Sequence, residues 1–215
     1  MTNQAITPTL RNIVFDMGGI LVGLDGARCI EAFERLGCPD VADYVRLHRT
    51  EDLFLEIERG LIGVPEFCER VRRLSHADLT DDAIVGAWNS LLTTVPVEKK
   101  ACLVRLHLAG YRLFLLSNTN EMHWRHCEQL LQHGEWTARQ LFEHVYLSNE
   151  MHLVKPDRAI YAAVLHESQL RPEETLFIDD REENCLGAAA LGIQTLHDPR
   201  GEEWCRLLSE RLLSE

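Results

Sequence analysis

Hydrophobic positions after residue 96 alternate between strand and helix patterns. Short apolar runs predict buried strands at residues 12–15, 111–116, 144–147, 175–178 and 194–196. Helical spacing predicts helices over residues 97–109, 121–132, 157–167, 182–191 and 204–213. Strands that alternate with helices indicate an α/β fold, in which a mostly parallel sheet carries helices on both faces.

Between residues 28 and 92 the apolar positions follow helical spacing alone. They fall into four groups, which begin near Ile30, Leu53, Phe67 and Ile84. Glycine and proline at residues 37–39, 60 and 63–65 separate the groups. The pattern predicts an all-helical insert of about four helices. Gly23 and Gly26 lie just before it and are expected to form a hinge.

Composition says more about the possible binding partners of the chain than about its fold. The 215 residues are 46% apolar and 26% charged, as in an ordinary globular protein with a hydrophobic core. The net charge of −12 repels nucleic acid, so nucleic-acid binding is disfavoured. The same charge is unfavourable for a phosphorylated ligand, which would need a bound cation and local positive groups.

Cysteine usage and hydropathy indicate a compartment. The seven cysteines are scattered and form no C-x-x-C pair, which predicts free thiols rather than disulfides or a zinc site. Residues 1–11 lack the apolar run of a signal peptide, and no stretch approaches the ~20 apolar residues of a membrane span. We therefore expect a cytoplasmic protein without a membrane partner. The sequence leaves the oligomeric state open, and a monomer is compatible with it.

Residues that carry chemistry follow several of the predicted strands. In chain order they are Asp16, the pair Ser117-Asn118, Lys155 and the pair Asp179-Asp180. Because parallel strands present their carboxyl ends at one edge of the sheet, these residues are expected to converge on one crevice. Taken singly, each has a simpler interpretation: a turn residue, a helix cap or a surface lysine.

The order and type of these residues resemble the haloacid dehalogenase superfamily, most of whose members are phosphatases. The stretch DMGGILVGLD further resembles a subgroup that has Gly two residues after its nucleophile. The resemblance spans the chain. It implies a Rossmann-like core at residues 1–26 and 96–215, with residues 27–95 as a small α-helical cap.

The resemblance implies a Mg²⁺-dependent phosphatase acting on a small phosphorylated metabolite, for which a sugar phosphate is one candidate. Asp16 would attack phosphorus and form an aspartyl-phosphate that water hydrolyses. An anionic carboxylate needs a cation to approach a phosphate, and Mg²⁺ prefers carboxylate, carbonyl and substrate oxygens. The implied metal ligands are Asp16, Asp180 and the backbone carbonyl of Gly18. Asp179 and Asn184 would support them from behind, although Asn184 could equally face solvent.

The remaining motif residues would hold the phosphoryl group. Ser117 would donate a hydrogen bond to it and Lys155 would offset its charge, so both are expected to bind substrate and take part in catalysis. Asn118 is expected to bind substrate as well. Further donors are the backbone N–H groups of Gly18, Asn118 and Thr119.

The insert is expected to determine substrate specificity. Its candidate contacts are Arg28, Glu56, Trp88 and Asn89. Arg28 is equally compatible with gripping a substrate phosphate or carboxylate and with a surface ion pair, whereas packing is the favoured role of Trp88.

Gly18 departs from the family pattern, because most of the phosphatases carry an Asp there as general acid and base. Losing such a group typically costs about 10²–10⁴-fold in rate. Three explanations stay open: a substrate with a good leaving group, such as an anomeric sugar, aryl or acyl phosphate; another acid, with Asp25 the nearest candidate; or slow or absent turnover. We expect the rate to depend steeply on the pKa of the leaving group.

Two other functions compete with the phosphatase. In a 2-haloacid dehalogenase the same Asp16 attacks carbon without a metal, but the Asp179-Asp180 pair would repel a carboxylate substrate. A non-catalytic ligand-binding protein is the other alternative, which retention of Asp16, Lys155 and Asp180 together disfavours.

Overall fold

The computed structural model describes residues 9–46, 53–75 and 77–213. Within them a five-stranded sheet forms in the order β3-β2-β1-β4-β5, and every neighbouring pair is parallel. The strands are β1 (Asn12–Phe15), β2 (Arg112–Ser117), β3 (His144–Leu147), β4 (Thr175–Asp179) and β5 (Gln194–His197). The α/β fold predicted from the sequence is confirmed.

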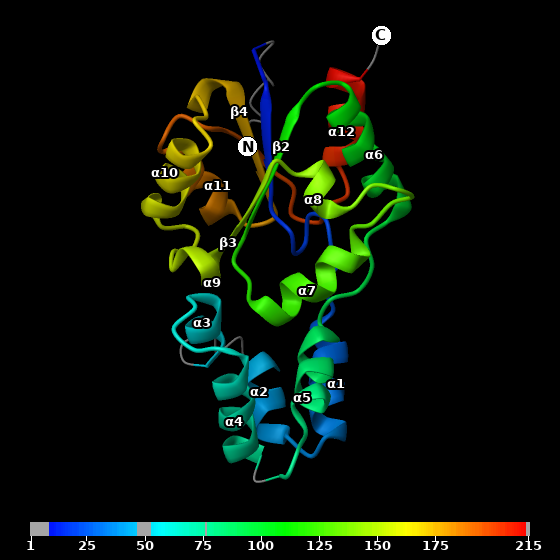
Figure 1. Cartoon of the computed structure of the whole chain (residues 1–215), viewed down its shortest axis with the longest axis vertical. Helices are drawn as coiled ribbons and strands as arrows, with labels where there is room; N and C mark the ends of the chain where they lie inside the picture. Colours follow the sequence, from blue (N-terminus) through cyan, green and yellow to red (C-terminus); the bar gives the residue numbers. More distant parts are fainter. Residues whose placement is uncertain (1–8, 47–52, 76, 214–215) are drawn as a thin grey trace.

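Side chains of the strands alternate between two hydrophobic clusters, one on each face of the sheet. On one face, Ile13 and Phe15 join α6 (Val97–Leu108), α8 (Ala138–Leu141) and α12 (Trp204–Leu212). On the other face, Val14 and its neighbours join α10 (Arg158–Glu167) and α11 (Glu182–Ala189). Figure 1 shows the two helical layers on either side of the sheet.

The register of the sheet places three strand ends side by side. Phe15 of the central strand lies opposite Leu115 of β2 and Ile178 of β4. The residues that follow therefore leave the sheet at the same edge, and these include Asp16, Ser117 and Asp179.

The helical insert has a hydrophobic core of its own. Five helices form it in the described residues: α1 (Gly26–Arg35), α2 (Pro39–Arg46), α3 (Leu53–Glu58), α4 (Val64–Ser75) and α5 (Asp81–Asn89). They share a buried cluster that includes Phe33, Phe67 and Ile84, and Met122 of α7 (Glu121–Leu130) joins it. Figure 1 shows the insert at one end of the molecule. This separate core supports the predicted division at residues 26 and 96, which stays a prediction.

Two linkers join the insert to the sheet and run side by side. Thr93 donates its N–H to the carbonyl of Gly23 at 2.8 Å, and Gly23 donates to Thr94 at 3.1 Å. A Cβ atom at Gly23 would overlap with the hydroxyl of Thr93, so the close approach of the linkers requires glycine there. Hinge motion about Gly23 and Gly26 stays a prediction.

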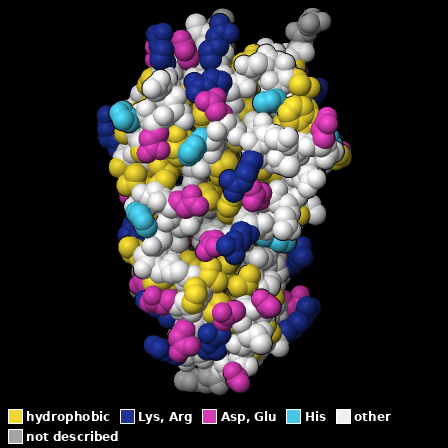
Figure 2. Space-filling view, in the orientation of Figure 1, with side chains coloured by type: hydrophobic (Ala, Val, Ile, Leu, Met, Phe, Trp, Pro, Cys, Tyr) yellow, Lys and Arg dark blue, Asp and Glu magenta, His cyan; other side chains and the backbone are white. Residues whose placement is uncertain are grey.

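The cysteines have the state that the sequence predicted. All seven cysteines are free, and every one except Cys205 is buried. Basic and acidic side chains are interspersed on the face shown in Figure 2. Among the described residues, no helix combines the length and the apolar character that crossing a membrane requires.

Candidate active site

Three carboxylates gather where β1 and β4 leave the sheet. Asp16 directly follows β1, Asp179 ends β4, and Asp180 comes next in the chain. One oxygen from each lies within 4.8 Å of those of the other two. Such a set of hard oxygen donors suits a divalent cation such as Mg²⁺.

A buried lysine partly balances this cluster. The Nζ atom of Lys155 lies 2.8 Å from Asp16 Oδ1 and 2.7 Å from Asp179 Oδ2, and its side chain is 1% exposed. It also donates to the carbonyl of Leu116 at 3.1 Å. The interpretation of Lys155 as a surface lysine is therefore wrong. One lysine faces three carboxylates, so the cluster keeps an excess of negative charge, which a cation would neutralise.

The pKa values of the pair reflect burial and this charge excess. Burial raises the pKa of Asp16 to about 7, against the opposing charge of Lys155, and the neighbouring charge of Asp179 adds to the rise. Burial by itself would lower the pKa of Lys155. The charges of Asp16 and Asp179 outweigh that effect, so its pKa is raised and the lysine stays protonated.

Asp179 differs from Asp16 and Asp180 because both of its carboxylate oxygens accept hydrogen bonds from several protein groups. Its Oδ1 accepts the N–H of Arg181 at 2.8 Å, and the amide of Asn184 donates to both carboxylate oxygens at 2.9 and 3.0 Å. Oδ2 also binds Lys155. These contacts support the prediction that Asp179 orients the site rather than holding the metal. Asn184 is buried, so the alternative that it faces solvent is wrong.

Asp180 is half-buried and lies against Gly19. Burial raises its pKa, and the charge of Asp179 raises it further. Gly19 has φ +79°, and a Cβ atom there would lie 2.5 Å from Asp180 Oδ2. The second glycine of DMGG is therefore required both for its backbone conformation and for space beside the acidic cluster.

Asn118 holds the backbone of Lys155. Its Nδ2 donates to the carbonyl of Lys155 at 2.9 Å, and its Oδ1 accepts the N–H of Lys155 at 2.8 Å. Helix α7 is capped instead by Asn120, whose side chain accepts the N–H of His123, so the capping interpretation of Ser117 and Asn118 is wrong. The Asn118 side chain thus positions the lysine, and its expected direct contact with substrate stays a prediction.

Comparison with known proteins agrees with this arrangement. The model of the haloacid dehalogenase-like hydrolase family matches residues 10–192. The chain belongs to this family. The predicted family and the predicted hydrolase class are thereby confirmed.

Three known proteins resemble this chain over most of its length. A D-ribitol-5-phosphate phosphatase of Bacteroides thetaiotaomicron is 29% identical over 91% of this chain and 95% of its own length. A solved haloacid dehalogenase family enzyme of the same organism, in complex with magnesium and inorganic phosphate, is 37% identical with a TM-score of 0.87, covering 92% of this chain and 98% of that one. The sesquiterpene phosphatase astK of Aspergillus oryzae is 25% identical over 88% of this chain and 90% of its own.

In this hydrolase the insert meets the core at α9 (Ser148–Met151). Ser148 accepts the N–H of Thr119 at 2.9 Å, and its hydroxyl lies 2.6 Å from the carbonyl of Glu58 and 3.1 Å from that of Thr119. The N–H of Thr119 is therefore engaged, and its expected role as a donor to substrate has no support in this conformation. Periodicity gave no reason to single out Ser148, because it lies in a helix of one turn.

A cavity of about 600 Å³ lies between the insert and the strand ends. On the core side it is lined by Gly18, Ser117, Asn118 and Thr119. On the insert side apolar side chains predominate, among them Leu24, Ile30, Phe54 and Trp88. Trp88 is buried and stacks between Phe54 and His123, which supports the packing role expected of it.

Two expected specificity residues, Arg28 and Glu56, and the candidate acid Asp25 lie elsewhere. Arg28 is exposed and does not line this cavity. Glu56 pairs with Arg70, and Asp25 caps α1 through the N–H groups of Ala27 and Arg28. These three positions are not brought to the strand ends. Glu58, which the sequence analysis did not single out, does line the cavity.

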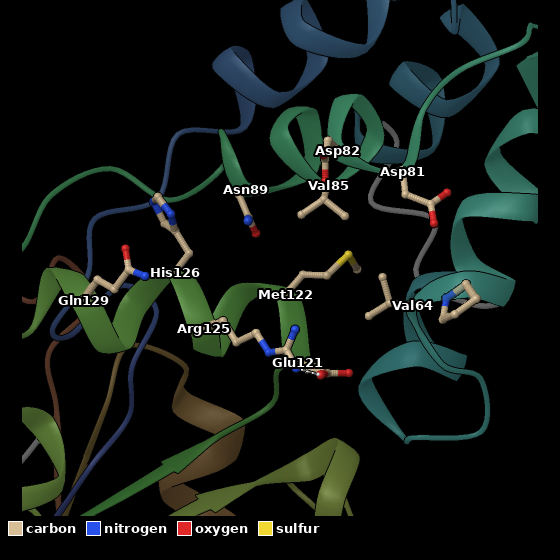
Figure 3. A pocket seen from close by; sticks show the side chains of 11 residues that line it. Val64, Asp81, Asp82, Val85, Asn89, Glu121, Met122, Arg125, His126 and Gln129 are labelled. Carbon is tan, nitrogen blue, oxygen red and sulfur yellow. Dashed lines mark ion pairs between the residues drawn. The ribbon is translucent and has the colours of Figure 1, made fainter.

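A second cavity, of about 630 Å³, lies between α4, α5 and α7. Figure 3 shows that Asn89, Met122 and Arg125 point into it, with Arg125 paired to Glu121. Asn89 is thus the one expected specificity residue that lines this cavity. Of Asp16, Ser117 and Lys155, none lines this cavity and only Ser117 lines the first.

Proposed function

We propose that this hydrolase is a Mg²⁺-dependent phosphatase of a small phosphorylated metabolite, with Asp16 as the nucleophile. The observation that carries the proposal is the buried group in which Lys155 bridges Asp16 and Asp179 while Asp180 lies beside them. The relatives that act on phosphate esters, and the magnesium and phosphate bound in the solved family member, support it.

Asp16 is oriented for attack by its own hydrogen bonds. Its Oδ1 accepts the N–H of Met17 at 2.7 Å and contacts Lys155, whereas the described residues provide no hydrogen bond to Oδ2. Oδ2 therefore has no protein donor in the described residues, which leaves it open to the cation or to phosphorus, and the Asp16 carboxylate forms the aspartyl-phosphate. Lys155 and the Ser117 hydroxyl stabilise the phosphoryl oxygens. Mg²⁺, held by Asp16, Asp180 and the Gly18 carbonyl, supplies charge neutralisation between carboxylate and phosphate.

The substrate class follows from the relatives and the cavity together. Similarity to the D-ribitol-5-phosphate phosphatase favours a phosphorylated polyol or sugar as the substrate of this hydrolase. The apolar lining of the cavity favours a second candidate, an apolar phosphate monoester, and a sesquiterpene phosphatase is among the relatives. Polyol and isoprenyl monophosphates therefore form the two arms of a substrate screen.

Replacing the nucleophile tests the proposal. Asp16→Asn removes the attacking carboxylate, so phosphate release should fall by on the order of 10³-fold or more while the fold persists. EDTA should abolish the wild-type activity, and added Mg²⁺ should restore it. The measurement is phosphate release from both arms of the screen, with circular dichroism as the control for folding.

The same experiment separates the alternatives. Halide release from a 2-haloacid that persists in EDTA would establish the dehalogenase instead. No turnover on any phosphate ester, with ligand binding unchanged in Asp16→Asn, would establish a non-catalytic binding protein.

A further inference from the structure

The proposed phosphatase needs a proton donor that its first motif does not provide. Gly18 has no side chain to transfer a proton to the leaving group. Asp25, the nearest acid in sequence, is committed to α1, because its carboxylate accepts the N–H groups of Ala27 and Arg28 at 3.1 and 3.2 Å. An alkyl phosphate leaves poorly without a proton, so another acid is required if such an ester is the substrate.

Glu58 is the only acidic residue that lines the cavity in the described part of the chain. It is the last residue of α3 and faces the strand ends from the insert. It forms none of the ion pairs found among the described residues, whereas the nearby Glu56 is paired with Arg70. His123 also lines the cavity, but burial lowers its pKa to about 4, so it is neutral at physiological pH.

The chain is fixed to the core at Glu58 and at the two residues that follow it. The hydroxyl of Ser148 lies 2.6 Å from the carbonyl of Glu58, and His152 Nδ1 lies 2.9 Å from the carbonyl of Arg59. Gly60 has φ +66°, and a Cβ atom there would overlap with the carbonyl of Asn149. Three successive residues of the insert thus lie against α9 and His152, the residue that follows it, next to the loop of Ser117 and Thr119.

We propose that Glu58 is the general acid and base of this phosphatase, supplied to the phosphoryl site by the insert in place of the missing residue at position 18. The proposal rests on the phosphatase function proposed above. It assigns to α3 a chemical role in addition to its packing.

The electrostatic surroundings suit the role. Burial raises the pKa of Glu58 to about 7, and the charges of Arg181 and Lys155 oppose that rise. From the other elements around the cavity, the charged or titratable groups are Arg46 of α2 and the neutral His123 of α7. Arg46 is already paired with Glu34 and Asp43. An acid with a pKa near the working pH both donates and accepts protons efficiently.

The protons balance over the two steps. In the first, the bond from Asp16 to phosphorus forms, the ester bond breaks, and protonated Glu58 gives its proton to the departing oxygen. In the second, ionised Glu58 takes a proton from water as the water oxygen attacks phosphorus. Asp16 then leaves as a carboxylate, inorganic phosphate is released, and Glu58 is protonated again.

The test is Glu58→Gln, which preserves shape and removes the proton. On D-ribitol 5-phosphate, kcat should fall by about 10²–10⁴-fold with KM little changed. 4-Nitrophenyl phosphate has a leaving group that needs no proton. With this ester, the rate constant of aspartyl-phosphate formation, measured in a single turnover, should stay within a few-fold of wild type. The matched control Glu56→Gln, two residues earlier on α3, should leave both reactions unchanged.

The pH profile provides a second readout. The wild-type rate on the alkyl ester should fall as pH rises above the pKa of Glu58, because the acid form is lost. Glu58→Gln should lack that limb. Equal losses on the two esters, an effect on KM alone, or no effect in Glu58→Gln would each overturn the proposal.

Asp16→Asn, assayed in parallel, keeps the two proposals distinguishable. If it loses both activities while Glu58→Gln loses neither, only the role of Glu58 is overturned. If Asp16→Asn retains turnover, the proposed phosphatase mechanism fails, and the role of Glu58 fails with it.

Discussion

Asn118 shows how a single side chain determines the position of Lys155. Its amide makes two hydrogen bonds to the backbone of Lys155, one donated and one accepted, so the residue after β2 fixes a residue 37 positions later. The ammonium group of Lys155 then bridges Asp16 and Asp179. These contacts therefore preorganise the Lys155 side chain in the absence of a ligand.

Asn118→Ala should loosen that arrangement. Each intramolecular hydrogen bond contributes about 1 kcal/mol, and the partly buried partners lose both bonds, so we expect a destabilisation of about 1–3 kcal/mol. Urea unfolding measures it. The phosphatase rate should fall as well, because Lys155 is less well oriented. Asn149→Ala, on the neighbouring α9, is a control whose side-chain oxygen has no hydrogen-bond partner in the structure; equal destabilisation by both variants would contradict the assignment.

Among the elements, those with a full periodic pattern were predictable and those of one turn were not. The predicted bounds of β1 and β3 coincide with the structure. Helices α8 and α9, four residues each, contain too few positions to show a period. In the insert, the described residues contain five helices instead of about four, because α2 (Pro39–Arg46) lies between the groups that begin near Ile30 and Leu53, where the sequence predicted no helix.

Only part of the candidate site could be predicted from the sequence, and the reason differs from that for the short helices. Residues that end strands were predictable, because strand ends converge in a parallel sheet. Glu58 and Ser148 belong to separate elements whose contact depends on how the insert lies on the core, and no local pattern encodes that. Gly60 was a usable signal, since a glycine directly after a helix often has positive φ, although here it also marks a close approach.

At the level of elements, Gly60→Ala should detach the end of α3 from α9. The new methyl group meets both the left-handed backbone and the Asn149 carbonyl, so we expect a loss of stability of more than about 1 kcal/mol and a lower kcat on alkyl esters. Gly37→Ala is the matched control: its φ is +74°, but nothing lies within 4 Å of the added atom. Thermal unfolding and kinetics of both variants decide it, and equal effects on kcat would contradict a specific role for the contact.

For the whole molecule, the acidic cluster couples stability to pH and to metal. The pKa of Asp16 is raised from 3.8 to about 7 by burial. A carboxyl group whose pKa is raised on folding stabilises fully below its unfolded pKa, and that stabilisation is lost as pH rises through the folded value. The metal-free protein should therefore lose stability between about pH 4 and about pH 8, by on the order of a few kcal/mol.

Mg²⁺ should offset this loss, because it binds the ionised carboxylates and displaces the proton. We expect the Mg²⁺-induced increase in Tm to be small near pH 5 and to grow toward about pH 8. Thermal scans in EDTA and in excess Mg²⁺ measure it. In Asp16→Asn the pH dependence should be flatter, and an increase in Tm that is the same at both pH values would refute the linkage.

The hydroxyl of Ser148 has a consequence for reversibility. This hydroxyl has one proton and lies near two carbonyl oxygens, that of Glu58 in the insert and that of Thr119 in the Rossmann-like core. If the predicted hinge motion separates α3 from the core, the hydroxyl can rotate to the carbonyl of Thr119, so its proton keeps an acceptor. If that motion occurs, the junction can open and close repeatedly without leaving this hydroxyl unpaired.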